Sequence, residues 1–310
     1  MPELEATPGG AIYLAGPTAV GKSRLALEIA RQLGGEMISV DSMQVYQGLD
    51  IGTAKASASD QDEVPHHLID IVPLDHPFDV QQFLTRTADV IPGIKRRQHV
   101  PIFCGGTGLY FKAFLEGLDP LPPPDPALRK TLENTPTKAL LEELRENDPR
   151  RYQSIDRQNP RRIIRAVEIL RLSSQSPSDQ RTSWSRENPR GRLIVLSRQP
   201  DELRHRIHDR VDQMMGEGLI EETQNLLTRG LRENPIACQA LGYRQVIEYL
   251  EGQYSKEDTI QRIKTKTWQF ARRQLTWFRK QPHTKWIDLS GTSLRQQLAA
   301  ILQPSIPSSP

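Results

Sequence analysis

Short apolar runs alternate with longer amphipathic segments over the first 117 residues of the chain. The apolar runs predict strands at 11–15, 37–40 and 100–104. The other segments repeat apolar residues at helical spacing and predict helices at 22–33, 79–97 and 107–116. Because buried strands separated by amphipathic helices pack as a parallel sheet with helices on its faces, we predict an α/β fold.

The alternation of apolar runs and amphipathic segments ends after residue 118. Five prolines in the eight positions 119–126 exclude a regular element and predict a domain boundary. Helical spacing follows at 127–146 and 160–172, and a polar stretch over 173–192 precedes the apolar run Leu193–Leu196. We interpret that run as another strand of the first sheet. Residues 120–190 are therefore predicted to form a mostly helical insertion domain.

The rest of the chain is predicted to complete the α/β core. Residues 1–119 supply its first part and residues 191–302 the remainder, with helical spacing at 201–229, 239–251 and 256–280. The tail 303–310 is rich in serine and proline, so we expect it to be disordered.

A complete G-x-x-x-x-G-K-[ST] phosphate-binding loop lies between the first predicted strand and the first predicted helix. It comprises Gly16, Pro17, Thr18, Ala19, Val20, Gly21, Lys22 and Ser23. The glycines let backbone N–H groups surround phosphate oxygens, Lys22 reaches the outer phosphate, and the Ser23 hydroxyl can bind Mg²⁺. All fixed positions and both flanking elements are present, which argues against a chance glycine-rich turn. The loop predicts a P-loop core that binds a diphosphate or a triphosphate, without distinguishing between them.

Composition narrows the class of protein. The 310 residues are 36% hydrophobic and 25% charged, as in globular domains, and no apolar stretch approaches the ~20 residues that span a bilayer. The N-terminal segment has no signal-peptide pattern, and two cysteines give no disulfide framework, so we expect a cytoplasmic protein. The net charge is only +3, so any affinity for nucleic acid must come from where the charges lie.

Positive charge is concentrated in two segments. Residues 261–285 contain eight basic residues and no acidic one, and a helix there places four of the basic side chains on one face: Arg262, Lys266, Arg273 and Lys280. A second cluster, Arg161 to Arg165, places Arg161 and Arg165 opposite an apolar stripe. Either cluster alone is typical of a solvated surface. Two of them beside a phosphate loop favour an enzyme that acts on a nucleic acid.

The motifs of the chain also resemble those of the tRNA dimethylallyltransferases, in their order and over almost the whole length. The matching segments are GPTAVGKS (16–23), ISVDSMQVY (38–46), GLDIGTAK (48–55), CGGTGLYFKAFLEGL (104–118), NPRRIIRAVEIL (159–170), LGYRQ (241–245) and RRQLTWFR (272–279). Many nucleotide-binding families share the first segment, whereas ISVDSMQVY together with GGTGLYF is far more restrictive. No Cys/His pair indicates the zinc finger of eukaryotic members, so the resemblance is to the bacterial type.

The resemblance implies a reaction. In this family the N6 amine of the adenosine at position 37, next to the tRNA anticodon, attacks C1 of dimethylallyl diphosphate, and diphosphate leaves with the help of Mg²⁺. The implied partners are the anticodon stem-loop of tRNA and dimethylallyl diphosphate, with no membrane. We expect a monomer.

The resemblance also assigns site residues. It implies that Lys22 and Ser23 act on the diphosphate, that Asp41 accepts the N6 proton, that the Thr107 hydroxyl lies near the base, and that Arg210 is a further cation. From the residues alone, Asp41 and Thr107 are equally typical of helix N-caps, and Arg210 of a surface neighbour of Arg206. The implied tRNA contacts are Asp41, Ser42, Met43, Gln44, Thr107, Arg129, Arg161, Arg162, Ile163, Ile164, Arg165, Gly242, Tyr243, Arg244, Arg273, Gln274 and Trp277.

Three other functions fit part of the pattern. A small-molecule kinase could use the loop for ATP, but it has no need for the basic segment at 261–285. A nucleotide-dependent RNA-binding switch would form no covalent product. An adenylate isopentenyltransferase acting on free AMP or ADP shares the chemistry, but it needs neither the insertion nor the basic helix.

Overall fold

The computed structural model describes residues 10–118, 121–173, 193–282 and 284–302. It divides into two compact units, one formed by residues up to 115 together with those from 189 onwards, the other by 116–188. The polar stretch from 174 and the tail 303–310 lie outside the described residues.

The first unit is built on a parallel sheet, as predicted. Its strands in the described residues are β1 (Ile12–Ala15), β2 (Gly35–Val40), β3 (His66–His67), β4 (Val100–Gly105), β5 (Leu193–Ser197) and β6 (Thr284–Asp288). They are arranged in the order β3-β2-β4-β1-β5-β6, and every neighbouring pair is parallel. The four strands predicted from apolar runs are confirmed, and the run at 193 pairs with β1.

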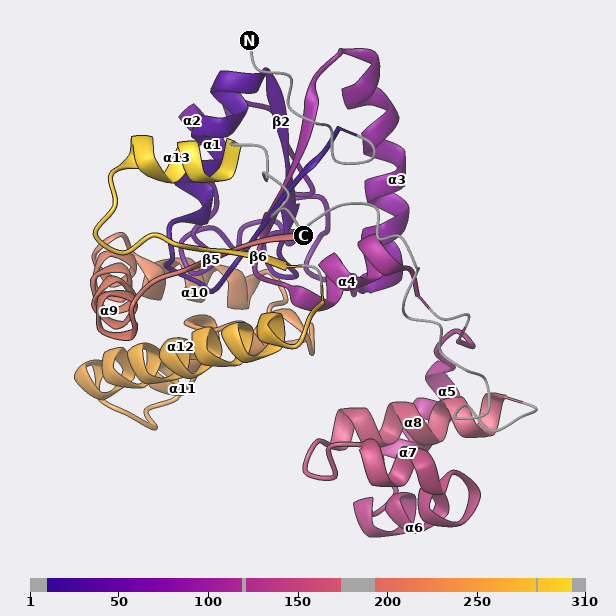
Figure 1. Cartoon of the computed structure of the whole chain (residues 1–310). Helices are drawn as coiled ribbons and strands as arrows, with labels where there is room; N and C mark the ends of the chain where they lie inside the picture. The colour runs from indigo at the N-terminus through magenta and orange to yellow at the C-terminus, as the bar shows by residue number, and fades with distance from the viewer. Residues whose placement is uncertain (1–9, 119–120, 174–192, 283, 303–310) are drawn as a thin grey trace. The chain divides into compact units, whose positions relative to one another are not determined.

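Helices cover both faces of this sheet (Figure 1). They are α1 (Lys22–Leu33), α2 (Ala58–Glu63), α3 (Val80–Arg96), α4 (Gly108–Glu116), α9 (Pro200–Gly216), α10 (Leu219–Thr228), α11 (Tyr243–Leu250), α12 (Lys256–Arg279) and α13 (Leu294–Leu302). The continuous helix predicted over 201–229 is wrong, because Gly218 adopts a left-handed conformation with φ of 101° that ends one helix and starts the next.

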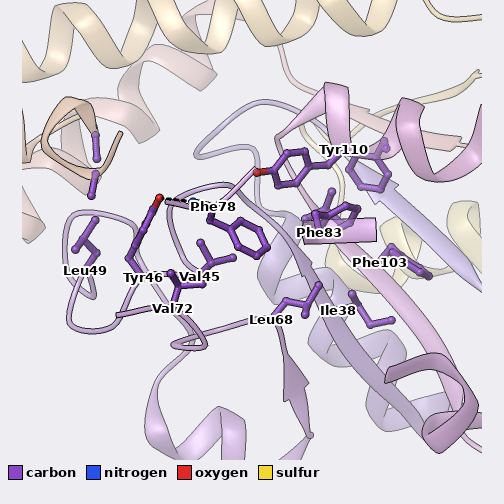
Figure 2. Close-up of a cluster of buried hydrophobic side chains, with 14 of the residues drawn as sticks. Ile38, Val45, Tyr46, Leu49, Leu68, Val72, Phe78, Phe83, Phe103 and Tyr110 are labelled. Atoms are coloured by element: carbon purple, nitrogen blue, oxygen red, sulfur yellow. Dashed lines mark hydrogen bonds between the residues drawn. The ribbon is translucent and has the colours of Figure 1, made fainter. Parts of the chain in front are cut away.

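Alternate residues of each strand enter two separate hydrophobic cores. In β4, for example, Ile102 and Cys104 face the core beneath α1 and α13, whereas Phe103 faces the opposite core. Figure 2 shows part of this second core, where the Tyr46 hydroxyl accepts a hydrogen bond from Phe78 N over 3.1 Å. Residues 41–55 form the loop that follows β2 at the carboxyl edge of the sheet. The hydrogen bond from Phe78 to Tyr46 holds this loop in place.

The second unit is helical, with α5 (Pro126–Glu133), α6 (Thr137–Asn147), α7 (Pro149–Ser154) and α8 (Pro160–Leu172) around its own apolar core. The single helical segment predicted at 127–146 is two helices. Pro136 lacks an N–H group and disfavours a helical Thr135, so α5 ends and α6 begins there. The Glu168 carboxylate is fully buried in this unit and accepts hydrogen bonds from Arg129 and Arg165, each over 2.6 Å.

Candidate active site

The phosphate loop connects β1 to α1 at the carboxyl edge of the sheet. Gly16, Ala19 and Gly21 have positive φ angles of 148°, 62° and 107°. A Cβ atom at Gly16 would lie 2.7 Å from the Leu196 carbonyl oxygen, so only glycine fits beside β5. The loop therefore has the conformation that points backbone N–H groups at an anion, next to the positive end of the α1 dipole.

Three arginines surround the loop from α9 and the turn before it. Arg206 Nε donates to the Ala19 carbonyl and Arg198 Nε to the Val20 carbonyl, each over 2.9 Å. Arg210 Nη1 donates to Thr18 Oγ1 over 3.3 Å, so Arg210 lies against the loop rather than on the helix surface. The roles of Arg198 and Arg206 could not be predicted from local sequence patterns, because their loop partners are more than 170 residues away. Together they bind two carbonyls and a hydroxyl of the loop and place positive charge beside it.

Lys22 is half-buried, and its Nζ donates to the Pro17 carbonyl over 2.6 Å. Burial lowers the pKa of Lys22 to about 8; Arg210 also lowers it, whereas the Cys104 thiol and the Asp41 carboxylate act in the opposite direction. Cys104 is buried, and burial raises the pKa of its thiol to about 11. A phosphate oxygen would restore the full charge of Lys22, so the site is poised for an anionic ligand.

Asp41 follows β2 at the same edge. Its Oδ1 accepts from Met43 N over 2.8 Å and from Gln44 N over 3.4 Å, so it caps the following turn. In the part of the chain that the structure describes, both hydrogen bonds to this carboxylate use Oδ1, which leaves Oδ2 for a substrate proton. Thr107 Oγ1 accepts from Ser42 N over 3.2 Å, which ties the loop after β4 to the Asp41 turn.

Gln274 of α12 connects the phosphate loop to the loop after β4. Its Oε1 accepts from Thr18 N over 2.9 Å, and its Nε2 donates to the Gly106 carbonyl over 3.0 Å. A Cβ atom at Gly106 would lie 2.3 Å from Gln274, and one at Gly108 would lie 2.2 Å from the Trp277 ring. The glycines of GGTG are therefore required for α12 to approach the sheet.

Two cavities are lined by residues of the site. The smaller has a volume of about 520 Å³ and is lined by Asp41, Thr107 and Gln274. The larger, of about 1150 Å³, is lined by Lys22, Ser23 and Arg210. Gly52 and Thr53 line the smaller cavity, and Asp50, Ile51 and Ala54 line the larger one, so we call the segment 50–54 the wall between them.

The residues predicted to contact tRNA occupy several environments. Those lining the smaller cavity are Asp41, Ser42, Met43, Thr107, Arg244, Arg273 and Gln274. Gln44 lies beneath it, bonded to the Thr53 carbonyl over 3.1 Å. Gly242 and Trp277 are packed between elements of the first unit. In the second unit Arg161 and Arg162 are exposed and Ile164 is half-buried, whereas Arg129 and Arg165 are engaged by Glu168.

Two of the predicted tRNA contacts have fully buried side chains. Ile163 belongs to the core of the second unit, and Tyr243 packs on Gly52 in the first. Their side chains cannot reach a ligand at the surface, so an RNA contact at these positions is restricted to backbone atoms and stays a prediction.

The residues at the loop fit Mg²⁺ in the manner typical of phosphate sites. Among the described residues no group of three or more His, Cys, Asp or Glu side chains could hold a metal ion. Mg²⁺ is usually held by one or two protein oxygens, water and substrate phosphates, and Ser23 lies at the start of α1 in the larger cavity.

The fold and site define a class: a P-loop α/β protein with one cavity at its phosphate loop and a second cavity lined by a carboxylate. The family model described as IPP transferase matches residues 44–281, and one described as isopentenyl transferase matches residues 10–72. The chain belongs to the IPP transferase family and is an enzyme of the prenyltransferase class.

Named relatives agree with this assignment. A tRNA dimethylallyltransferase of Dictyoglomus turgidum is 40% identical over 94% of this chain and 90% of its own length. A tRNA dimethylallyltransferase of Syntrophobacter fumaroxidans is 42% identical over 91% of this chain and 84% of its own length. The solved tRNA isopentenylpyrophosphate transferase of Bacillus halodurans superimposes with a TM-score of 0.71 at 37% identity, covering 95% of this chain and 94% of that one. The solved structure of a eukaryotic dimethylallyltransferase acting on tRNA superimposes with a TM-score of 0.80 at 27% sequence identity. The match covers 93% of this chain and 77% of that one. Within the described ranges, every helix is too short or too polar to cross a membrane.

Proposed function

We propose that this enzyme transfers a dimethylallyl group from dimethylallyl diphosphate to N6 of the adenosine at position 37 of tRNA, next to the anticodon, and releases diphosphate. One observation carries the proposal. The cations Lys22 and Arg210 line the larger cavity and the Asp41 carboxylate lines the smaller one, and residues of the single segment 50–54 line both cavities. A donor diphosphate and an acceptor amine therefore have adjacent sites on either side of one wall.

The larger cavity supplies what a diphosphate leaving group needs. Negative charge develops on the bridging oxygen as the C1–O bond breaks, and preorganised donors stabilise it more in the transition state than in the ground state. Lys22, Arg210 and the amides of the loop are those donors. Mg²⁺ bound at Ser23 would add charge neutralisation on the same phosphates.

The smaller cavity supplies the group that activates the nucleophile. The lone pair of exocyclic N6 is delocalised into the adenine ring, so a carboxylate that accepts its proton makes attack on C1 easier. Asp41 is in place for this role because its turn is fixed by bonds to Met43 N and Gln44 N. An adenosine stacked in the anticodon loop has to be extruded to enter, at a cost of a few kcal/mol that contacts in the cavity offset.

Nucleoside analysis tests the proposal directly. We expect mass spectrometry of tRNA incubated with the enzyme, dimethylallyl diphosphate and Mg²⁺ to show N6-isopentenyladenosine. Parallel incubations with AMP and with ATP distinguish an adenylate isopentenyltransferase and a kinase, and unmodified tRNA would refute the assignment. We also propose that the enzyme acts in the cytoplasm as a monomer, which light scattering and fractionation would check.

The pKa of Lys22 predicts how diphosphate binding depends on pH. The free lysine loses its charge as the pH rises through about 8, whereas a bound phosphate keeps it protonated to higher pH. The affinity for inorganic diphosphate should therefore be constant below pH 8 and fall by up to about tenfold per pH unit above it. Calorimetry from pH 6.5 to 9.5 measures this. The titration of diphosphate itself affects both proteins equally, so the ratio of the wild-type affinity to the Lys22→Met affinity reports the titration of Lys22. A ratio that does not change with pH would contradict the prediction.

The basic face of α12 predicts the salt dependence of tRNA binding. Lys266 and Arg273 are exposed side chains of this face that line the smaller cavity, whereas Arg262 is held by Glu248 over 3.0 Å. Each cation that neutralises a phosphate adds about 0.9 or less to the slope of log affinity against log salt. Replacing Lys266 and Arg273 by glutamine should flatten this slope by between one and two and leave diphosphate binding unchanged.

A matched variant is available on the same helix. Lys264 pairs with Asp212 over 2.7 Å, so Lys264→Gln removes one charge from α12 without removing a free phosphate contact. We expect its slope to stay at the wild-type value. Equal slopes for all three proteins would show that this face of α12 does not bind the RNA backbone.

A further inference from the structure

The wall between the two cavities is held from below by two side chains of α10 and α11. Glu222 on α10 accepts from Ile51 N over 3.0 Å and from Gly52 N over 3.4 Å. The Tyr243 hydroxyl at the start of α11 donates to Glu222 Oε1 over 2.7 Å and accepts from Gly52 N over 3.1 Å. We name this arrangement of Glu222, Tyr243 and the two amides the wall clamp.

The packing of the clamp leaves little freedom. The Tyr243 ring is fully buried and lies against Gly52, where a Cβ atom would be 2.4 Å from the ring. Burial raises the pKa of the Tyr243 hydroxyl, and the neighbouring Glu222 carboxylate raises it further, so this hydroxyl stays a hydrogen-bond donor. The backbone of residues 51–52 is therefore fixed both by the ring and by hydrogen bonds to a charged acceptor, which are stronger than neutral ones.

The carbonyl of the next residue along the wall accepts hydrogen bonds from side chains on both sides. The Thr53 carbonyl accepts from Arg210 Nη2 over 3.4 Å, on the side of the phosphate loop. The same carbonyl accepts from Gln44 Nε2 over 3.1 Å, on the side of the Asp41 turn. One backbone oxygen thus sets the positions of a diphosphate cation and of a residue that follows the proton acceptor. A shift of this oxygen would change both at once.

We propose that Glu222 and Tyr243 are positioning residues for the transfer step, which they set by fixing the wall segment rather than by contacting either substrate. This inference rests on the proposed function, because the donor and acceptor sites lie on the two sides of that wall. Misplacing reacting groups by about 1 Å can cost about 100-fold in rate. Loosening the clamp should therefore reduce the chemical step much more than it reduces the binding of either substrate.

Tyr243→Phe is the sharpest test, because phenylalanine keeps the ring against Gly52 and removes only the hydroxyl. We expect the single-turnover rate with both substrates saturating to fall by about 10- to 100-fold. The dissociation constants for tRNA and for inorganic diphosphate should stay within about threefold. Amide hydrogen exchange at residues 51–53 should become at least tenfold faster, and this readout needs no catalysis. Thermal unfolding reports the folded fraction by which each rate is corrected.

A pair of variants at Glu222 tests whether a conservative substitution retains the activity that alanine removes. Glutamine retains an oxygen that can accept from Ile51 N and Gly52 N, so Glu222→Gln should keep the rate within about fivefold of wild type, whereas Glu222→Ala should resemble Tyr243→Phe. Glu221→Gln on the exposed side of α10 and Tyr249→Phe on α11 are matched controls and should behave as wild type.

Each outcome has a separate meaning. A wild-type enzyme that forms no prenylated tRNA refutes the proposed function, while the exchange experiment still tests the clamp. An active wild type with an equally active Tyr243→Phe overturns the positioning role. So does a loss confined to tRNA affinity, because the clamp would then support RNA binding rather than the transfer step.

Discussion

Replacement of Lys22 by alanine should abolish prenyl transfer, with a loss in kcat/KM of at least ~10³-fold. Its ammonium lies inside the phosphate loop, 2.6 Å from the Pro17 carbonyl, where no other side chain of the loop carries a charge. Removing one preorganised donor from a developing oxyanion typically costs ~10²–10³-fold, and Lys22 contributes a full charge from a half-buried position. Product formation from dimethylallyl diphosphate and tRNA, followed by nucleoside analysis, measures the loss.

Two further variants separate the effect of the Lys22 charge from the effect of its packing, and from the effect of removing any cation that lines the cavity. Lys22→Met keeps the aliphatic stem, so it should be as inactive as Lys22→Ala while unfolding at a temperature closer to wild type. Arg24→Ala removes an exposed cation that lines the same cavity, and its rate should stay within about fivefold of wild type. A Lys22→Ala enzyme with a near-normal rate would place the diphosphate outside this loop.

Asp41→Asn should slow the chemical step by ~10²–10⁴-fold and leave tRNA affinity within a few-fold. Asparagine keeps an oxygen that accepts from Met43 N and Gln44 N, so the turn after β2 is preserved. It cannot accept the N6 proton, and that is the function removed. Single-turnover rates at saturating tRNA measure the effect without interference from binding or product release.

The control for this variant is another carboxylate of the site. Asp209→Asn changes an exposed side chain that lines the larger cavity, and it should retain most of the activity. If Asp41→Asn reduced only the affinity for tRNA, Asp41 would be a binding residue and the proton acceptor would have to be another group.

Contiguous features of the chain were predictable from the sequence. The phosphate loop, its flanking strand and helix, and the strand at Leu193 follow from local patterns that tertiary contacts did not change. β6 was missed because it is an edge strand in which Ile287 is the only buried residue, so it has no apolar run. The break at Pro136 could have been predicted from the residue itself, whereas the break at Gly218 depends on a backbone conformation that glycine permits but does not require.

The sequence by itself therefore determined the α/β core, the phosphate loop and the family, because each is encoded by residues that are neighbours along the chain. Only the tertiary structure decided which side chains complete the site. Arg198 and Arg206 reach the loop, Gln274 bridges Thr18 to Gly106, and Glu222 and Tyr243 of the wall clamp accept hydrogen bonds from the backbone of residues 51–52. These contacts join positions 168 to 256 residues apart, or depend on space that only a glycine leaves. The physical reason is that burial and hydrogen-bond geometry at such contacts arise from packing, which no local spacing of residues encodes.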